Sequence, residues 1–256
     1  MGMYTNPEPI APPSQALMLL EGRAIWELGA FMWSLPWLSL GPRGDGHPVL
    51  VIPGLATDDN ATLPLQSLLR ELGYAAYGWH NGFNDGSWAV LDAHLSRHLG
   101  QLRAQHGEKV SLIGWSMGGL FARQLAKQAP DDVRQVIMLG SPFAGDSRVD
   151  DPLGLQRPAG RRAMRGLQAR GSLHRPPPLP TTSIFSRTDG LVAWQCCVEQ
   201  DGPLVDNIEI DASHWGLAHH PAALYAIADR LAQPDGHWRP FERRGPQGLF
   251  YPDPRR

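Results

Sequence analysis

The sequence predicts an α/β fold with a mostly parallel central sheet and helices on both faces. Short apolar runs alternate with segments of helical periodicity through the centre of the 256-residue chain. Several of these runs are apolar at every position, which is typical of strands that are buried on both faces of a parallel sheet. One run leads directly into Gly-Trp-Ser-Met-Gly and then into a helical pattern, so a sharp strand-to-helix turn is expected there.

The elements before that turn follow in chain order. A helix is expected to end near Trp37, and HPVLVIPG, closed by Pro53 and Gly54, is expected to form the first strand. Residues 61–73 place four leucines on one helical face and end at Gly73, which suits a helix C-terminus. The run YAAYGW predicts a second strand. An apolar stripe then predicts one long helix that carries Trp88, Leu91, Leu95, Leu99 and Leu102.

The second half of the chain repeats the alternation. Residues 109–114 form the predicted strand before the turn, and residues 117–129 form the helix after it, which ends before Pro130. Three further strands are expected at VRQVIMLG, TTSIFS and NIEI. PAALYAIADRLA is expected to form a helix with Pro221 in its first turn, where proline is tolerated.

We divide the chain into an N-terminal segment at 1–46, a main domain at 47–232 and a tail at 233–256. Within the main domain, residues 145–180 are rich in arginine and proline and are too long for an ordinary connection. We interpret them as an insertion that forms a small cap, with a helix near 158–170.

Charge and cysteine content narrow the class of protein. The formal net charge of −2, without a long run of Lys or Arg, does not indicate a nucleic acid partner. Cys196 and Cys197 are adjacent, which disfavours a bridge between them, and no CxxC metal pattern is present. The N-terminus lacks the basic region and cleavage site of a secretory signal. We therefore expect a cytoplasmic protein, with membrane association as an open alternative.

Residues 24–40, AIWELGAFMWSLPWLSL, are rich in Trp, Leu and Phe. The segment contains Glu27 and Pro36 and is shorter than the ~20 apolar residues that a membrane span needs. Two interpretations stay open. The segment is either a helix packed on the domain, or a lid or interfacial helix that contacts a membrane or a lipid surface.

The Gly-Trp-Ser-Met-Gly sequence suggests a nucleophile at Ser116. Gly114 and Gly118 allow tight backbone passage at the turn, which exposes the Ser116 hydroxyl above the carboxyl end of the sheet. The position is also near a helix N-terminus, whose free N–H groups favour negative charge. A glycine-rich turn with a capping serine is the alternative interpretation.

A serine hydroxyl needs a base that is oriented by an acid, and in this type of sheet the chain order is Ser, then Asp or Glu, then His. Asp189 follows one late strand and His214 follows the next, both at carboxyl ends. We therefore predict His214 as the base and Asp189 as the orienting acid. Three rivals stay open for these roles: Asp146 as the acid, and His219 or His220 as the base.

An oxyanion hole needs two donors. The predicted donors are the backbone N–H of Met117, which follows the nucleophile, and that of Leu55 in the loop after the first strand. Gly54 lets this loop approach the site closely.

At this point the residues resemble the α/β-hydrolase superfamily, and in particular its bacterial serine esterases and lipases. The resemblance covers about residues 47–232, and it is carried by four stretches in the right order: Pro53-Gly54-Leu55, residues 114–118, residues 186–192 and residues 213–216. It implies ester hydrolysis through an acyl-enzyme, without a metal or organic cofactor. Many relatives have His-Gly where this chain has Pro53-Gly54, which keeps the backbone donor and changes its neighbourhood.

The substrate is expected to be a small-molecule or lipid-like ester. Trp115, Phe143 and Trp215 are candidates for apolar walls of the pocket, or else belong to the core. The loop at 78–86, GWHNGFNDG, is a further candidate, with helix capping by Asp85 or Ser87 as the alternative. An acyltransferase, a thioesterase or an amidase with the same three residues stays open, as does a binding protein that keeps the fold without catalysis.

Overall fold

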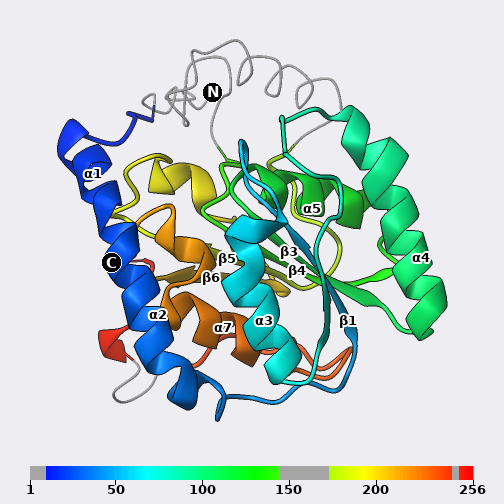
Figure 1. Ribbon diagram of the computed structural model, residues 1–256. Helices are drawn as coiled ribbons and strands as arrows, with labels where there is room; N and C mark the ends of the chain where they lie inside the picture. The colour runs from blue at the N-terminus through cyan, green and yellow to red at the C-terminus, as the bar shows by residue number, and fades with distance from the viewer. Residues whose placement is uncertain (1–9, 145–172, 244–247, 256) are drawn as a thin grey trace, which may run out of the picture.

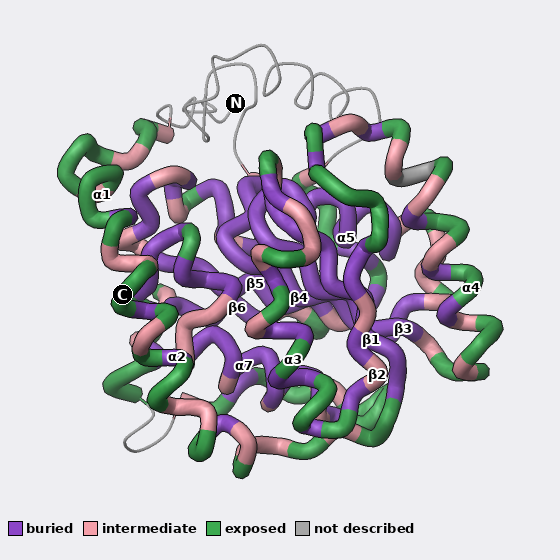
Figure 2. Tube along the Cα trace, in the orientation of Figure 1, coloured by how far each residue is buried: buried purple, intermediate pink, exposed green. Residues whose placement is uncertain are grey.

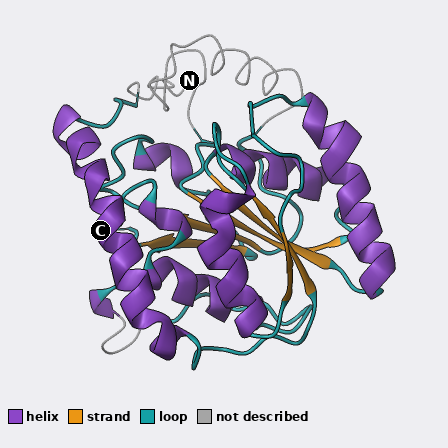
Figure 3. Cartoon of the chain, viewed as in Figure 1, coloured by secondary structure: helices purple, strands orange, loops and turns teal. Residues whose placement is uncertain are grey.

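The computed structural model describes residues 10–144, 173–243 and 248–255. Six strands form one parallel sheet in the order β2-β1-β3-β4-β5-β6. Helices lie on both sides of this central sheet (Figure 3). The predicted α/β fold with a parallel sheet is therefore confirmed.

The strand bounds agree with the apolar runs of the sequence. They are β1 (Pro48–Ile52), β2 (Ala75–Tyr77), β3 (Val110–Trp115), β4 (Val133–Leu139), β5 (Thr181–Phe185) and β6 (Val205–Glu209). Every residue of β1, β3, β4 and β5 is buried. Because successive side chains point to opposite faces, such strands need a helical layer on each side.

Two separate hydrophobic clusters form these layers. On one face, Val49 and Val51 pack in a cluster with α3 (Leu63–Glu71) and α7 (Pro221–Leu231). On the other face, Leu50 and Ile52 pack in a cluster with α4 (Ser96–His106) and α5 (Met117–Gln128). The strands between them are buried along most of the sheet (Figure 2).

The predicted long helix after β2 differs at its start. A π-helical turn, η3 (Leu91–Leu95), precedes α4. Trp88, Leu95, Leu99 and Leu102 are buried as the stripe predicts. The π turn shifts the helical phase, which the periodicity of the sequence did not indicate.

The N-terminal segment contains three consecutive helical pieces, α1 (Gln15–Leu20), η1 (Glu21–Arg23) and α2 (Ala24–Leu38). They run along one edge of the molecule, with α2 against α7 and the short turn η5 (Gly216–Ala218) (Figure 1). Phe31 and Leu38 bury their side chains in the core. No helix among the described residues is both long and apolar enough to span a membrane.

The remaining predictions concern the insertion and the tail. Most of the insertion, including the expected helix near 158–170, lies outside the described residues, and the domain boundaries stay predictions. In the tail, Phe241 and Tyr251 are buried, and the Tyr251 hydroxyl donates a hydrogen bond to the carbonyl of Ala222 in α7 (2.9 Å).

Candidate active site

Ser116 lies at the turn between β3 and α5, in a backbone conformation that non-glycine residues rarely adopt (φ 54°, ψ −120°). Its N–H donates a hydrogen bond to the carbonyl of Leu139 in β4 (2.8 Å). A Cβ on Gly114 would overlap the backbone of Gly118, and one on Gly118 would overlap the carbonyl oxygen of Ile52. The two glycines are therefore required by close backbone approach, and the sheet stabilises the strained serine.

Asp189 and His214 meet at the carboxyl ends of β5 and β6. The Nδ1 of His214 lies 2.7 Å from Oδ2 of Asp189, at hydrogen-bond distance. The other carboxylate oxygen, Oδ1, accepts hydrogen bonds from the backbone N–H groups of Leu191 (2.8 Å) and Val192 (2.7 Å). Both partners are buried. Because these bonds fix the orientation of the carboxylate, Asp189 can hold the imidazole in one tautomer.

The surroundings of His214 raise its pKa. Burial alone would lower the pKa, but the negative charge of Asp189, the hydrogen bond to Asp189 and the charge of Glu21 together outweigh burial. The pKa therefore lies above its ordinary value of 6.5. Such a histidine is a stronger base than a solvated imidazole.

The serine turn and the Asp–His pair lie at the same edge of the sheet. The indole N–H of Trp115 donates a hydrogen bond to the carbonyl of His214 (3.1 Å). Gly140, at the end of β4, packs against both members of the pair, since a Cβ there would lie 3.2 Å from Nδ1 of His214 and 3.3 Å from Oδ2 of Asp189. The structure thus places Ser116, Asp189 and His214 after the ends of β3, β5 and β6, at one edge of the sheet and in the chain order that the sequence predicted.

Comparison with known proteins agrees with this architecture. The sequence profile of the alpha/beta hydrolase fold matches residues 47–199, more than half of the chain. The chain belongs to the α/β-hydrolase family.

Relatives of this α/β hydrolase include esterases and lipases. A pimeloyl-[acyl-carrier protein] methyl ester esterase from Aliivibrio salmonicida is 30% identical over 114 residues, which are 42% of this chain and 40% of that protein. Among solved structures, Aspergillus fumigatus lipase B has a TM-score of 0.58 at 19% identity, covering 77% of this chain and 54% of that chain. A monoacylglycerol lipase from Paleococcus ferrophilus has a TM-score of 0.53 at 16% identity, covering 72% and 96%. The chain spans about half or less of the length of the esterase and of lipase B. At these low identities, the similarity to the two lipases shows only a shared fold.

The loop after β1 approaches Ser116 closely. A Cβ on Gly54 would lie 3.4 Å from Cβ of Ser116, so Leu55 is the next residue along a backbone that passes beside the serine. Met117 is the first residue of α5, and first-turn N–H groups have no partner within their helix. This arrangement is compatible with the two predicted oxyanion donors, which stay a prediction.

Two polar residues that hold this loop were missed by sequence reasoning. The buried side-chain amide of Asn84 donates to the carbonyl of Pro53 (2.9 Å), and its backbone exchanges hydrogen bonds with Ala56 and Thr57 (2.8 Å each). The Thr57 hydroxyl donates to the carbonyl of Gly54 (2.7 Å). Asn84 belongs to the loop at 78–86 that the sequence singled out, but its side chain holds the loop after β1. Within the same motif, the Asp85 carboxylate accepts from the N–H of Ser87 (2.8 Å).

The three predicted pocket residues differ in their surroundings. Trp115 is buried, and its ring lies 5.2 Å from that of Trp215, which is partly exposed. Phe143 is buried in the second cluster under the guanidinium of Arg123, 4.3 Å from the ring centre. Trp115 and Trp215 border His214 directly, whereas Phe143 is also a core residue, and a pocket role for the three stays a prediction.

The rival histidines have other partners. The Nε2 of His219 lies 3.2 Å from the carbonyl oxygen of Ala24, and the imidazole of His220 accepts from the N–H of Ala222 at the start of α7 (3.2 Å). Asp146, the rival acid, lies outside the described residues. Across residues 10–144, 173–243 and 248–255, no group of three or more His, Cys, Asp or Glu side chains could hold a metal ion.

Proposed function

We propose that this α/β hydrolase cleaves carboxylic esters through an acyl-enzyme formed on Ser116, with His214 as the general base and Asp189 as the orienting acid. The single observation that carries the proposal is the buried Asp189–His214 hydrogen bond at the strand ends beside the serine turn. The esterase relative supports the choice of an ester substrate.

The reaction would proceed in two steps. Ser116 Oγ attacks the ester carbonyl while Nε2 of His214 accepts the hydroxyl proton, since Nδ1 faces Asp189. The tetrahedral intermediate expels the alcohol, which leaves with that proton. Water then attacks the acyl-enzyme with His214 again as base, and the carboxylic acid is released from Ser116. The N–H groups of Leu55 and Met117 would stabilise the oxyanion in both steps.

A series of p-nitrophenyl esters from acetate to palmitate tests this function, with Ser116→Ala as the matched variant. We expect hydrolysis by the wild type and a loss of about 10⁶-fold in kcat for Ser116→Ala. Circular dichroism controls for folding. A folded wild-type protein that hydrolyses no member of the series would contradict the proposal. Parallel assays with a thioester, an amide and an added alcohol acceptor separate the thioesterase, amidase and acyltransferase alternatives.

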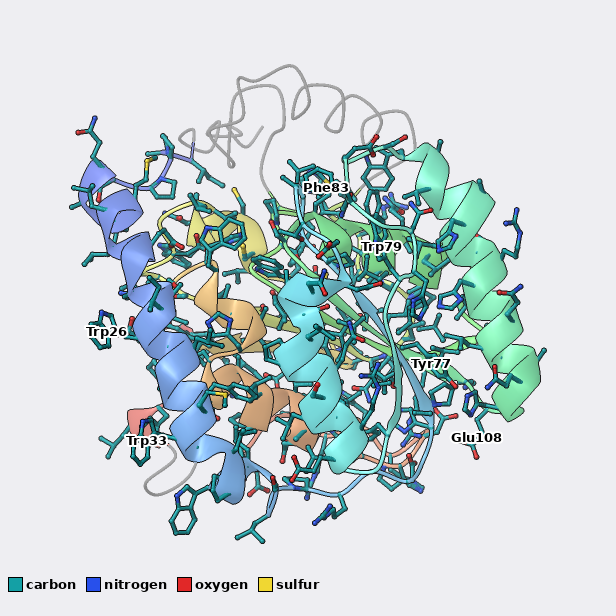
Figure 4. The ribbon with its side chains drawn as sticks, in the orientation of Figure 1. Trp26, Trp33, Tyr77, Trp79, Phe83 and Glu108 are labelled. Atoms are coloured by element: carbon teal, nitrogen blue, oxygen red, sulfur yellow. The ribbon has the colours of Figure 1, made fainter. Side chains whose placement is uncertain are left out.

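The exposed face of the N-terminal helix α2 favours a substrate that is presented at a lipid surface. Figure 4 shows Trp26 and Trp33 projecting outward from α2. The exposed fractions of Trp26, Trp33 and Trp37 are 81%, 86% and 77%. The charged residue of α2, Glu27, is buried, so the outer face of this helix carries no charge. Indole side chains favour the boundary between water and lipid, and we include contact of this face with lipid in the proposal.

Binding to vesicles tests the lipid contact. Sedimentation with phosphatidylcholine vesicles should capture the wild type, and Trp26→Ser combined with Trp33→Ser should reduce capture while leaving hydrolysis of p-nitrophenyl acetate unchanged. The matched control is Phe83→Ser, which changes an exposed aromatic side chain in the loop at 78–86, away from α2. Wild-type dimers in analytical ultracentrifugation that the double variant abolishes, without vesicle binding, would instead identify a second copy as the occupant.

A further inference from the structure

The N-terminal helical pieces contact both loops that carry Asp189 and His214. The carboxylate of Glu21 lies between these loops, and its Oε1 accepts hydrogen bonds from the N–H of Gly190 (2.7 Å) and of His214 (2.9 Å). Its Oε2 accepts from the N–H of Trp215 (3.3 Å). One side chain therefore joins the residue after the predicted acid to the backbone of the predicted base.

Glu27, two turns further along, holds the same histidine loop from its other side. Its Oε1 accepts from the N–H of Ser213 (2.8 Å), and its Oε2 accepts from the Ser213 hydroxyl. The Ser213 oxygen in turn accepts from the N–H of Gly216 (2.9 Å). His214 is thus flanked by residues whose backbone N–H groups are bound, directly or through Ser213, to carboxylates of the N-terminal segment.

Glycine occurs where the loops touch the helices. A Cβ on Gly190 would overlap the carbonyl oxygen of Leu17 and lie 2.9 Å from Cγ of Glu21. A Cβ on Gly216 would overlap Oε2 of Glu27 and lie 2.6 Å from its Cδ. The loops and the helices are therefore fitted to each other at two separate points.

Arg23 adds a contact on the solvent side of this arrangement. Its guanidinium lies 3.2 Å from Oε1 of Glu27 and donates to the hydroxyl (2.6 Å) and the carbonyl (3.2 Å) of Thr188, directly before Asp189. Buried carboxylates are unfavourable unless they are fully hydrogen-bonded. The partners of Glu21 are three backbone N–H groups of these loops. Those of Glu27 are the N–H and hydroxyl of Ser213 and the guanidinium of Arg23.

We propose that Glu21 and Glu27 are positioning residues. They hold the two loops that carry Asp189 and His214 at the separation that the Asp189–His214 hydrogen bond requires. The inference rests on the proposed function for its catalytic meaning. The two carboxylates act through the backbone, and neither is expected to touch the substrate. A displacement of about 1 Å at a catalytic group can cost about 100-fold in rate, so the contacts need only prevent small movements of the loops.

The charge of Glu21 also acts on the pKa of His214. This pKa can be measured, and a purely structural role of Glu21 would leave it unchanged. The titratable groups around His214 are Asp189 on the β5 loop and Glu21, Arg23 and Glu27 on the N-terminal helices, and the neighbouring Trp115 and Trp215 are uncharged. Asp189 and Glu21 both raise the pKa of His214. Replacement of Glu21 by a neutral residue should therefore lower this pKa.

The experiment compares Glu21→Gln and Glu21→Ala with the control Asp206→Asn. Asp206 is also a buried carboxylate, and it accepts hydrogen bonds from the N–H of Phe241 (2.5 Å) and from Arg243 (3.1 Å), but it lies at the start of β6 rather than after its end. The imidazole of His214 is titrated by ¹H–¹⁵N NMR, with His214→Gln to assign its signals. Melting temperature, kcat and KM are measured on the same proteins.

We expect Glu21→Gln to lower the pKa of His214 and to shift the acid limb of kcat/KM in the same direction. Glu21→Ala should reduce kcat about 100-fold with little change in KM. Asp206→Asn should lower the melting temperature and leave both the pKa and kcat unchanged. Equal loss of stability in Glu21→Gln and Asp206→Asn, with an unchanged His214 titration and kcat in both, would overturn the inference.

A second pair of variants tests the contact from the side of the loop. Gly216→Ala should push the carboxylate of Glu27 from its place and reduce kcat by about tenfold or more. Gly29→Ala is the control, because Gly29 lies on the same helix as Glu27 with open space around it, and this variant should keep its kcat. Equal kcat in the two glycine variants would count against Glu27, and this pair decides the matter if Glu21→Ala does not fold. If the wild type hydrolyses no ester, the proposed function fails, and the NMR titration of Glu21→Gln still tests the contact between Glu21 and His214.

Discussion

The serine side and the histidine side of the candidate site are held by different parts of the chain. Ser116 is fixed by the sheet itself, through the hydrogen bond to Leu139 and the close approach of Gly118 to β1. On the histidine side, the N–H groups of His214 and Ser213 donate to Glu21 and Glu27, which come from helices almost 200 residues earlier in the chain. One half of the candidate site is therefore held within the sheet, and we propose that the other half depends on the N-terminal segment.

This difference means that the two halves should fail independently. A change on the serine side should leave the titration of His214 as it is. A change on the histidine side should leave the strained turn at Ser116 intact, because that turn is held by the hydrogen bond to Leu139 and by the close approach of Gly118 to β1. The following predictions test this separation, in order of decreasing effect.

Asp189→Asn should have the largest effect on the histidine side, a loss of about 10⁴-fold in kcat. The variant keeps an oxygen for the N–H groups of Leu191 and Val192, but presents an amide N–H₂ to Nδ1 of His214. Nδ1 must then accept this N–H, so the imidazole carries its proton on Nε2 and cannot accept the Ser116 proton there. Steady-state kinetics measure the loss, and an unchanged melting temperature shows that the loops are intact. Full activity in folded Asp189→Asn would return the role of the acid to Asp146.

The wild-type pH profile should show the raised pKa of His214 directly. The base must be neutral, so kcat/KM should fall by about tenfold for each pH unit below this pKa. Because the pKa lies above 6.5, the fall should begin at a higher pH than for an ordinary histidine. Rates measured from pH 5 to 9 on a neutral ester check this, and an acid limb centred below 6.5 would contradict it.

Asn84→Ala should weaken the serine side by a smaller amount. The variant leaves the carbonyl of Pro53 and the N–H of Gly86 without their partner, at about 1–3 kcal/mol of stability for each group. The freed loop carries Leu55, so kcat should fall by about tenfold while the NMR titration of His214 stays unchanged. A shift in the His214 titration would show that the two sides are coupled.

Much of this arrangement could be predicted because its causes are local in sequence. The apolar runs specify the buried strands, and Gly-Trp-Ser-Met-Gly contains the residues that make the turn at Ser116 possible. Asp189 and His214 follow from chain order, since each comes directly after a strand of a parallel sheet. The π turn at 91–95 shows the limit, because the same apolar stripe fits a helix with or without it.

The support of the histidine side could not be predicted, because its contacts join distant segments. Glu21 is 169 residues from Gly190 and 193 residues from His214. In the sequence, Glu27 stood out only as an acid within an apolar segment, and nothing there indicated a partner for it. The exposure of Trp26 and Trp33 was equally hidden, because a helix that is apolar on all sides gives no periodic signal of which face is buried.

The smallest expected effect concerns Arg23, and it separates the two carboxylates from the partly exposed guanidinium beside them. The guanidinium of Arg23 pairs with Glu27 at 3.2 Å, but its side chain is 25% exposed, and pairs of this kind contribute about 0–1 kcal/mol. Arg23→Gln should therefore lower the melting temperature by about 2–4 °C at most and change kcat less than twofold. The N–H groups of Gly190, Ser213 and His214 keep their carboxylates in this variant, so His214 stays in place. A loss of kcat as large as that expected for Glu21→Ala would mean that the guanidinium of Arg23, rather than the two carboxylates, holds the histidine loop.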